Sequence, residues 1–347
     1  MSHANVSIFV PHVGCPHQCS FCDQRSISSA AFVPDGAFVR TQCQKALETF
    51  SGDPAKAQIA FFGGSFTAIP ETMMTELLEA ACEYVGEHGF DSIRVSTRPD
   101  AITPEILNVL KKYHVRSVEL GAQSMNDRVL ALNLRGHTAQ DVEKASRMIR
   151  DFGFELGLQM MVGLYGENAK DALLTAEKLA ALRPDTVRVY PTVVLKNTFL
   201  AKLYTEGKYL PPSTEEIVEV CAELLDFFEK NNIPVIRLGL HDSPTLRGAR
   251  VAGVYHPALR ELCEARRTRK KVLSALTTCP RGDYTIVVSD RYLSQYIGQK
   301  KENCEFLKSR GYSVTFVPDP TVQNRDFVLK KGERPHESIE ILGNAGL

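Results

Sequence analysis

The chain has 347 residues, of which 44% are hydrophobic and 24% are charged, and its net charge is zero. This composition is typical of a soluble globular protein. No apolar run approaches the roughly 20 residues that a membrane-spanning helix needs, so we expect no membrane partner. The first five residues lack the basic and apolar character of a signal peptide. Nine cysteines without paired spacing favour a reducing, cytoplasmic location.

Three cysteines follow the first predicted strand with the spacing Cys15-x3-Cys19-x2-Cys22. Three thiolates can hold a four-iron cluster and leave one iron open to a cofactor or substrate, whereas four cysteines close the cluster for electron transfer. The alternative is a structural zinc site completed by His12 or His17, but no later pair of Cys or His ligands follows. The odd number and the clustering of these cysteines disfavour disulfides.

From residue 5 to about residue 240, short apolar runs alternate with longer amphipathic stretches. This alternation predicts an α/β fold, a partial (β/α)6 TIM-like barrel, with its active site at the carboxyl ends of the strands. The predicted strands are Val6–Val10, Gln58–Phe62, Ser92–Ser96, Ser117–Leu120, Glu155–Val162, Thr186–Tyr190 and Val235–Leu238. The predicted helices include Glu71–Glu87, Pro104–Tyr113, Ala139–Phe152, Ala169–Leu182 and Ser213–Asn231.

A polar or glycine-rich signature follows each of the second to sixth predicted strands. These signatures are Gly63–Thr67, Ser96–Asp100, Gly121–Ser124, Gly163–Glu167 and Tyr190–Thr192. Because the carboxyl ends of parallel strands lie at one end of a barrel, we expect these segments to surround one site together with the cysteines.

The last third of the chain differs in charge and pattern. Residues 245–347 carry 18 Lys and Arg against 11 Asp and Glu, a net charge of +7, which suggests an anionic partner or, alternatively, an ordinary solvated surface. Pro and Gly are frequent over 242–257. We therefore divide the chain into a barrel over 1–241, a linker with a basic helical segment over 242–279, and a small basic α+β domain over 280–347.

The cysteine triplet, with Phe21 before its last cysteine, resembles the radical S-adenosylmethionine (SAM) superfamily over most of residues 5–240. The resemblance implies a [4Fe–4S] cluster held by Cys15, Cys19 and Cys22, with SAM bound to the open iron. It also implies an external electron donor and reductive cleavage of SAM to a 5′-deoxyadenosyl radical. In such enzymes the cofactor supplies the chemistry, while the protein positions it and excludes water.

The same resemblance implies which residues contact SAM. These are Phe21, Gly63, Gly64, Arg98, Gln123, Arg135 and Gln159. The glycine pair would meet the SAM amino group through its backbone, which a side chain would obstruct. The guanidinium of Arg135 would pair with the SAM carboxylate, for which its planar fork is suited.

Within the superfamily, the chain looks like the catalytic subunit of Elongator, which modifies the wobble uridine of transfer RNA with an acetyl group from acetyl-CoA. The resemblance is carried by Phe62–Thr67, Thr97–Asp100, Gly121–Ser124, Arg135–Thr138 and Tyr190–Thr192. It implies Tyr190 and Lys196 as candidates on the substrate side. The chain has no room for the acetyltransferase domain of that family, so the radical core is expected without the acetyl-CoA reaction.

The helix–turn–helix expected between two strands of the last domain resembles a minimal KH module. Its turn offers Gly298, Lys300 and Lys301 as candidate RNA contacts, and Lys301 stands where a KH loop has its second glycine. The leading hypothesis is a radical SAM enzyme that modifies a tRNA or rRNA base. The alternatives are a small-molecule enzyme akin to coproporphyrinogen-oxidising relatives and a non-catalytic cluster-binding protein.

Overall fold

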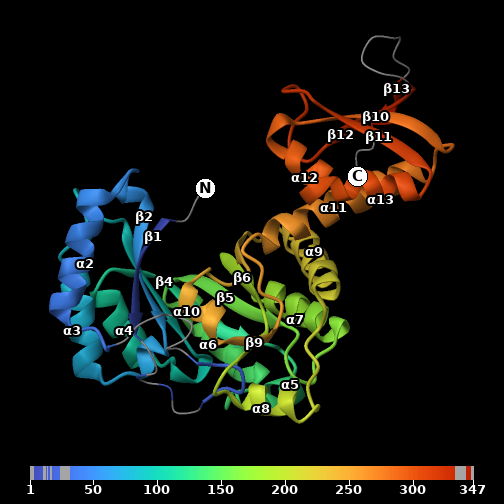
Figure 1. Cartoon of the computed structure of the whole chain (residues 1–347). Coiled ribbons are helices and arrows are strands. Elements are labelled where there is room, and N and C mark those ends of the chain that lie inside the picture. Colours follow the sequence, from blue (N-terminus) through green and yellow to red (C-terminus); the bar gives the residue numbers. More distant parts are fainter. Residues whose placement is uncertain are drawn as a thin grey trace. The chain divides into compact units, whose positions relative to one another are not determined.

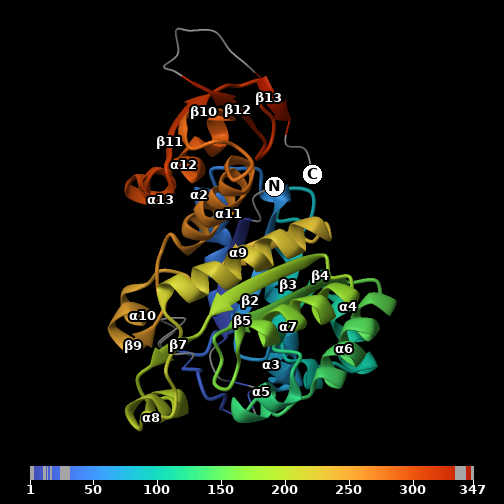
Figure 2. The same cartoon turned by 90° about the vertical axis from the view of Figure 1, so that its right-hand side faces the viewer.

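The computed structural model describes residues 4–10, 13, 15, 18–23, 32–332 and 341–344. His12 and His17, the extra ligands of the zinc alternative, lie outside the described residues. The chain divides into two units (Figures 1 and 2). The barrel unit comprises Met1–Val220 and Phe227–Pro257, and the C-terminal unit comprises Cys221–Asp226 and Ala258–Leu347.

The barrel unit contains a seven-stranded parallel sheet in the order β1-β2-β3-β4-β5-β6-β8. The strands are β1 (Ala4–Val10), β2 (Ala57–Gly63), β3 (Ser92–Thr97), β4 (Val115–Gln123), β5 (Glu155–Val162), β6 (Thr186–Pro191) and β8 (Val235–Leu238). All seven predicted strands are confirmed. The expected α/β fold with a partial TIM-like barrel is therefore confirmed.

Most helices of this unit lie around the outside of the sheet (Figures 1 and 2). The helices of the unit are α2 (Gly36–Thr49), α3 (Glu71–Cys82), α4 (Pro104–Lys112), α5 (Asp127–Leu132), α6 (Ala139–Asp151), α7 (Ala169–Ala181), α8 (Phe199–Thr205), α9 (Thr214–Lys230), which continues into the C-terminal unit, and α10 (Pro244–Ala249). Short 3-10 turns are η1 (Pro54–Lys56), η2 (Phe66–Ala68) and η3 (Pro99–Ala101).

Three of these helices begin with a capping box, in which a polar side chain at the helix start and an acidic residue three positions later bond each other's backbone N–H groups. The pairs are Thr138 with Asp141, Asn168 with Asp171, and Ser213 with Glu216. These sequence signals explain why the predicted starts of α6, α7 and α9 agree with the structure to within one residue.

The strands carry apolar side chains on one face and polar side chains on the other, because successive residues of a strand point to opposite faces. In β4, Val118 and Leu120 are buried apolar residues, and Ser117 and Glu119 alternate with them. We call the face that carries Ser117 and Glu119 the inner face. The sheet curls around it, since the Arg188 guanidinium of β6 lies 5.2 Å from the ring centre of Phe62 on β2, although three strands lie between β2 and β6 in the sheet.

Residues 242–257 do not form a plain linker. They contain α10 and β9 (Arg250–Gly253), and β9 pairs antiparallel with β7 (Val193–Leu195) within the barrel unit. The sequence prediction missed these elements because both are short and flanked by proline and glycine.

The C-terminal unit has a four-stranded sheet in the order β11-β10-β12-β13, with β10 and β11 parallel. Its strands are β10 (Gly282–Val288), β11 (Tyr312–Pro318), β12 (Phe327–Lys331) and β13 (Ile341–Asn344). Its helices are α11 (Leu259–Leu276), η4 (Asp290–Tyr292), α12 (Leu293–Ile297), η5 (Gln299–Lys301) and α13 (Glu302–Ser309). The predicted strand, helix, turn, helix and strand over 284–317 are confirmed.

Helix α11 belongs to this unit, which therefore begins before the expected boundary at residue 280. Val272 and Leu276 of α11 pack in one core with Tyr284, Ile286 and Tyr296. No helix in the described part of the chain is long and apolar enough to cross a membrane.

Candidate functional site

The cysteine segment after β1 is anchored through Ser20, which is fully buried. The Ser20 N–H donates to the Asn133 carbonyl at 3.0 Å, and its Oγ donates to Asn133 Oδ1 at 2.8 Å. The Leu200 N–H donates to the Ser20 carbonyl at 2.7 Å. The segment is thus held at the residue next to Cys19, between the end of α5 and the start of α8.

The three thiols have different surroundings. Cys19 is buried, and its Sγ accepts a hydrogen bond from Arg135 Nη1 at 2.9 Å. Cys15 Sγ lies 3.8 Å from Ser65 Oγ, and Cys22 donates its backbone N–H to the Cys19 carbonyl at 3.1 Å. Among the described residues, no three Cys, His, Asp or Glu side chains are close enough together to hold one metal ion. The thiols thus share one segment but are not gathered into a ligand set.

Phe21 is half-buried and packs against two small apolar clusters. One cluster contains Val194 and Leu200 beside β7, and the other contains Met161 and Leu164 at the end of β5. The ring therefore lies at the carboxyl ends of the strands, where the sequence placed it.

Gly63 ends β2 in a conformation that other residues rarely adopt, with φ of 111°. A Cβ atom on Gly63 would lie 2.9 Å from the carbonyl oxygen of Val10, and the Gly64 N–H donates to that same oxygen at 2.8 Å. The close approach of β1 and β2 therefore requires a glycine at position 63 independently of any cofactor.

Buried polar atoms without a hydrogen-bond partner gather at the end of β4. They are Gln123 Oε1, Arg135 Nε and His137 Nδ1. Arg135 Nη2 donates to the Gly121 carbonyl at 2.6 Å, which fixes the guanidinium beside this strand. Burial lowers the pKa of His137 to about 4, so its ring is neutral. Because buried polar groups are normally paired, these atoms mark a place for a polar ligand.

Arg98 is buried but forms its hydrogen bonds within the protein. Its Nε donates to Asp100, and its Nη2 donates to the Arg135 carbonyl at 2.9 Å. Within the described residues, Arg98 thus supports the backbone of Arg135. The resemblance implied a contact with SAM, which these bonds leave untested.

Gln159 belongs to a buried polar network on the inner face. Its Nε2 donates to Glu119 Oε2 at 3.0 Å. Glu119 is 1% exposed and also forms ion pairs with Arg94 at 2.9 Å and with Arg188 at 2.8 Å. Burial alone would raise the pKa of Glu119, but the two guanidinium groups outweigh burial and lower it, so the carboxylate stays charged.

The sequence did not single out Glu119, Arg94 or His137. Glu119 and Arg94 interrupt apolar strands with charge, which is a usable signal because charges inside a sheet are rare unless they are paired. Only the strand pairing in the structure, from β3 through β4 and β5 to β6, shows that these charged side chains meet. For His137 the only signal in the sequence is its place within the segment Arg135–Thr138.

The two substrate-side candidates are placed differently. Tyr190 is on the inner face of β6, two residues beyond Arg188, and burial raises the pKa of its hydroxyl. Lys196 follows β7 and is exposed, and its backbone N–H donates to the Ala249 carbonyl at 2.9 Å. The structure therefore brings Tyr190 into the barrel and leaves the side chain of Lys196 at the surface.

The candidate RNA contacts form the turn between α12 and α13 in the C-terminal unit. Gly298, Lys300 and Lys301 have φ values of 74°, 50° and 64°. Both lysines are exposed. Lys301 thus adopts the left-handed conformation that a glycine would prefer at the same position.

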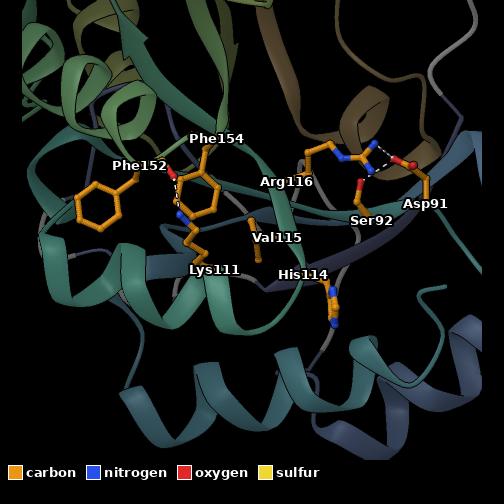
Figure 3. A pocket seen from close by; sticks show the side chains of 9 residues that line it. Asp91, Ser92, Lys111, His114, Val115, Arg116, Phe152 and Phe154 are labelled. Atoms are coloured by element: carbon orange, nitrogen blue, oxygen red, sulfur yellow. Dashed lines mark hydrogen bonds and ion pairs between the residues drawn. The ribbon is translucent and has the colours of Figure 1, made fainter.

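A cavity of about 270 Å³ lies elsewhere in the barrel unit (Figure 3). It is lined by Asp91, Ser92, Lys111, His114, Val115, Arg116, Phe152, Gly153 and Phe154. Ser92 and Val115 are the first residues of β3 and β4, so the cavity is at the amino ends of the strands. It is therefore separate from the cysteine segment, which follows the carboxyl end of β1.

The chain is similar to known proteins along most of its length. The model of the Radical SAM superfamily matches residues 9–179, and that of the Radical_SAM C-terminal domain matches residues 184–271. An uncharacterized protein of Methanocaldococcus jannaschii is 29% identical over 62% of this chain and 69% of its own length.

Other relatives carry functional names. A tRNA uridine(34) acetyltransferase of Methanocaldococcus infernus is 25% identical over 62% of this chain and 48% of its own length. Elongator complex protein 3 of Homo sapiens is 28% identical over 61% of this chain and 42% of its own length. The chain thus spans about half or less of these two proteins.

A solved structure shows the same fold. The Elp3 protein of Methanocaldococcus infernus with an N-terminal deletion superposes with a TM-score of 0.61 at 22% identity, covering 79% of this chain and 64% of that one. The curled parallel sheet, the cysteine segment and the two family matches lead to one conclusion. The chain belongs to the radical SAM superfamily and is a radical SAM enzyme, whose family uses a [4Fe–4S] cluster and SAM.

Proposed function

We propose that this enzyme modifies a base of a tRNA or rRNA. The observation that carries the proposal is the match of about three fifths of the chain to proteins named tRNA uridine(34) acetyltransferase and Elongator complex protein 3. The chain spans about half or less of those proteins. We therefore propose only that the substrate is RNA, and we do not propose that the enzyme transfers an acetyl group.

In donor chemistry, although not in the present positions of the three thiols, the residues at the strand ends fit the cofactor pair of the family. Cys15, Cys19 and Cys22 supply three thiols from one segment, the donor set for a cluster with one open iron. The unpartnered Gln123 Oε1 and Arg135 Nε offer an acceptor and a donor to SAM. When bound, the reduced cluster and SAM supply radical hydrogen abstraction, for which we also propose an external one-electron donor.

The chain's own residues would position and shield these groups. Arg135 donates to Cys19 Sγ and so orients the side chain of this cysteine. Arg98 holds the backbone of Arg135. Gly63 and Gly64 keep side chains away from the end of β2, Gln159 is oriented by Glu119, and Phe21 is expected to cover the adenine.

For RNA binding, we propose the turn formed by Gly298, Lys300 and Lys301. Two exposed lysines in a left-handed turn present their charges together and suit contact with a phosphate backbone. Part of the other positive charge of the C-terminal unit is used internally, because Arg267 is buried and pairs with Asp226 and Glu264 at 2.7 Å each. The proposed RNA contact thus involves fewer basic residues than the net charge of residues 245–347 suggested.

The test is anaerobic reconstitution of the full chain, followed by measurement of RNA-dependent SAM cleavage and mass spectrometry of the RNA. Bulk tRNA and rRNA are expected to stimulate cleavage and to acquire a new nucleoside. Substituting Lys300→Ala and Lys301→Ala together should weaken RNA binding about tenfold and reduce its dependence on salt. Lys111→Ala with Lys112→Ala, which removes the same charge from the exposed end of α4, is the matched control.

The proposal fails if no RNA fraction stimulates SAM cleavage or gains a modification. Turnover of a metabolite that purifies with the enzyme, in the absence of RNA, would instead identify a small-molecule radical SAM enzyme.

A further inference from the structure

We infer an oxyanion-binding subsite on the inner face of β6 and β8, formed by Arg188, Tyr190 and Arg237. The inference deepens the proposed function and rests on it, because it assigns the subsite to the substrate of the radical reaction. The ligand group is a phosphate or a carboxylate of that substrate.

The strand register places the two arginines side by side. Arg188 of β6 is the direct partner of Arg237 of β8 in a parallel pair. Side chains at paired positions of neighbouring strands project from the same face of the sheet. Contact of Arg188 with the Phe62 ring identifies this face as the inner one. Both arginines are half-buried, so neither guanidinium group is fully solvated.

The negative charge recorded near this pair does not balance it. Glu119 is the shared partner of Arg94 and Arg188. Among the described residues, Arg237 has no acidic partner, and its Nε donates to the Gly239 carbonyl at 2.9 Å. Glu155 is at the first position of β5, beyond the layer that contains Gln159 and Arg188. Glu119 thus balances two guanidinium groups and Arg237 is not one of them, and a half-buried cation without a counter-charge is costly.

Two further polar groups lie at the same end of β6. Burial raises the pKa of Tyr190, while Arg188 and Arg237 act to lower it, so the net rise leaves a protonated hydroxyl able to donate. Thr192, two residues further along, is 2% exposed, and its Oγ1 is buried without a partner. Tyr190 belongs to β6 and Thr192 directly follows it, whereas the unpartnered atoms assigned to SAM belong to β4 and the segment after it.

The chemistry of the group selects the ligand. Arg237 can present both Nη atoms to two oxygens of one anion, which is the geometry that a guanidinium uses for phosphate and carboxylate. The Tyr190 hydroxyl would add a third donor. A bound oxyanion would also supply the counter-charge that Arg237 lacks.

The test is isothermal titration of the full-length protein with uridine 5′-monophosphate, with uridine as the probe that lacks the anion and glutarate as the carboxylate probe. Saturable binding of at least one anion, and none of uridine, is expected. Arg237→Gln should weaken that binding about tenfold or more. The control is Arg150→Gln, because Arg150 is 42% exposed and pairs at 3.8 Å with Asp185 away from the inner face.

Tyr190→Phe removes one hydroxyl with little change of shape and should weaken anion binding severalfold, which keeps the test decisive if Arg237→Gln does not fold. The subsite is refuted if neither anion binds saturably, or if both variants bind like the wild type. A preference for uridine 5′-monophosphate would indicate a nucleotide phosphate, and a preference for glutarate a carboxylate substrate.

The two proposals fail separately. Anion binding that depends on Arg237, without any RNA modification, would retain the subsite and reject the RNA substrate. RNA modification that proceeds normally in Arg237→Gln, with unchanged anion binding, would retain the RNA substrate and reject the subsite.

Discussion

Gly63 is fixed by backbone geometry at the point where β1 and β2 come together. Gly63→Ala would place a methyl group 2.9 Å from the Val10 carbonyl oxygen in a conformation with φ of 111°. We expect a loss of about 2–4 kcal/mol in the free energy of unfolding, measured by chemical denaturation of the protein without cofactor.

The control for Gly63 is Gly153→Ala. Gly153 also has a positive φ, 84°, but a Cβ atom there would have no neighbour within 4 Å. Its cost should be about 1 kcal/mol, from the backbone strain alone. Equal losses in the two variants would show that the close approach of β1 and β2 is relaxed in solution.

Asn133 joins the cysteine segment to two other parts of the barrel unit. Its Oδ1 accepts from Ser20 Oγ at 2.8 Å, and its Nδ2 donates to the carbonyls of Val129 at 2.8 Å and Tyr165 at 2.9 Å. All polar atoms of this fully buried side chain are therefore used. Asn133→Ala should release the segment, so that Cys15 and Cys22 react several times faster with iodoacetamide and less iron is retained after reconstitution.

The matched control is Asn126→Ala. Asn126 caps the same helix, α5, by accepting from the N–H of Arg128, but it does not contact the cysteine segment. Loss of this cap should cost about 1 kcal/mol and leave the thiol reactivity unchanged. If both variants expose the cysteines equally, the effect belongs to the stability of α5 and not to the anchoring of Ser20.

The loop between β5 and α7 contains a carboxyl group that resists ionisation. Burial raises the pKa of Glu167 to about 8, although its Oε2 accepts from the backbone N–H groups of Gly163 at 2.7 Å and Leu164 at 3.2 Å. The folded protein therefore keeps a proton that the unfolded chain releases above its ordinary pKa of 4.5. Stability from this group is complete below pH 4.5 and is lost as the pH rises to about 8.

Glu167→Gln keeps the acceptor oxygen and removes the titration. Over pH 5 to 8, the free energy of unfolding of the wild type should fall by about 1–3 kcal/mol more than that of Glu167→Gln. Denaturant unfolding at a series of pH values measures this difference. Parallel pH profiles of the two proteins would contradict the buried, protonated state.

At the scale of elements, local sequence patterns were sufficient to predict the strands of the parallel sheet. They were insufficient to predict which side chains meet on its inner face. The strands of the sheet are apolar runs bounded by turn residues, and the capping boxes of α6, α7 and α9 are visible in the sequence. The network of Glu119, Arg94 and Arg188 depends instead on the register of three strands far apart in the chain. For the same reason, nothing in the sequence places Arg237 beside Arg188.

At the scale of the whole molecule, the net charge of a segment was a poor guide to how much positive charge its surface exposes. The net charge of residues 245–347 suggested an anionic partner or a solvated surface, yet the basic stretch of α11 includes Arg266 and Arg267, which are buried in the C-terminal unit. Sequence alone could not separate buried from exposed cations, because α11 is amphipathic and its partners, Asp226 and Arg325, lie about 40 and 60 residues away in the chain.

Glu264 connects parts of the C-terminal unit that are distant in sequence. It is 2% exposed and forms ion pairs with Arg267 at 2.7 Å and Arg325 at 2.9 Å. Glu264→Gln would remove one anion from between two guanidinium groups that remain buried or half-buried. We expect a loss of about 3 kcal/mol in the stability of this unit, because Arg267 and Arg325 each lose an ion pair inside it.

Hydrogen exchange of the full chain, read by peptide, measures this loss. Protection should fall in α11 and β10 in Glu264→Gln. Glu261→Gln, an exposed position on the same helix, should change protection by less than the equivalent of about 0.5 kcal/mol. Similar exchange in the two variants would mean that Glu264 is replaceable and that the apolar core around Val272 and Tyr296 alone holds the unit together.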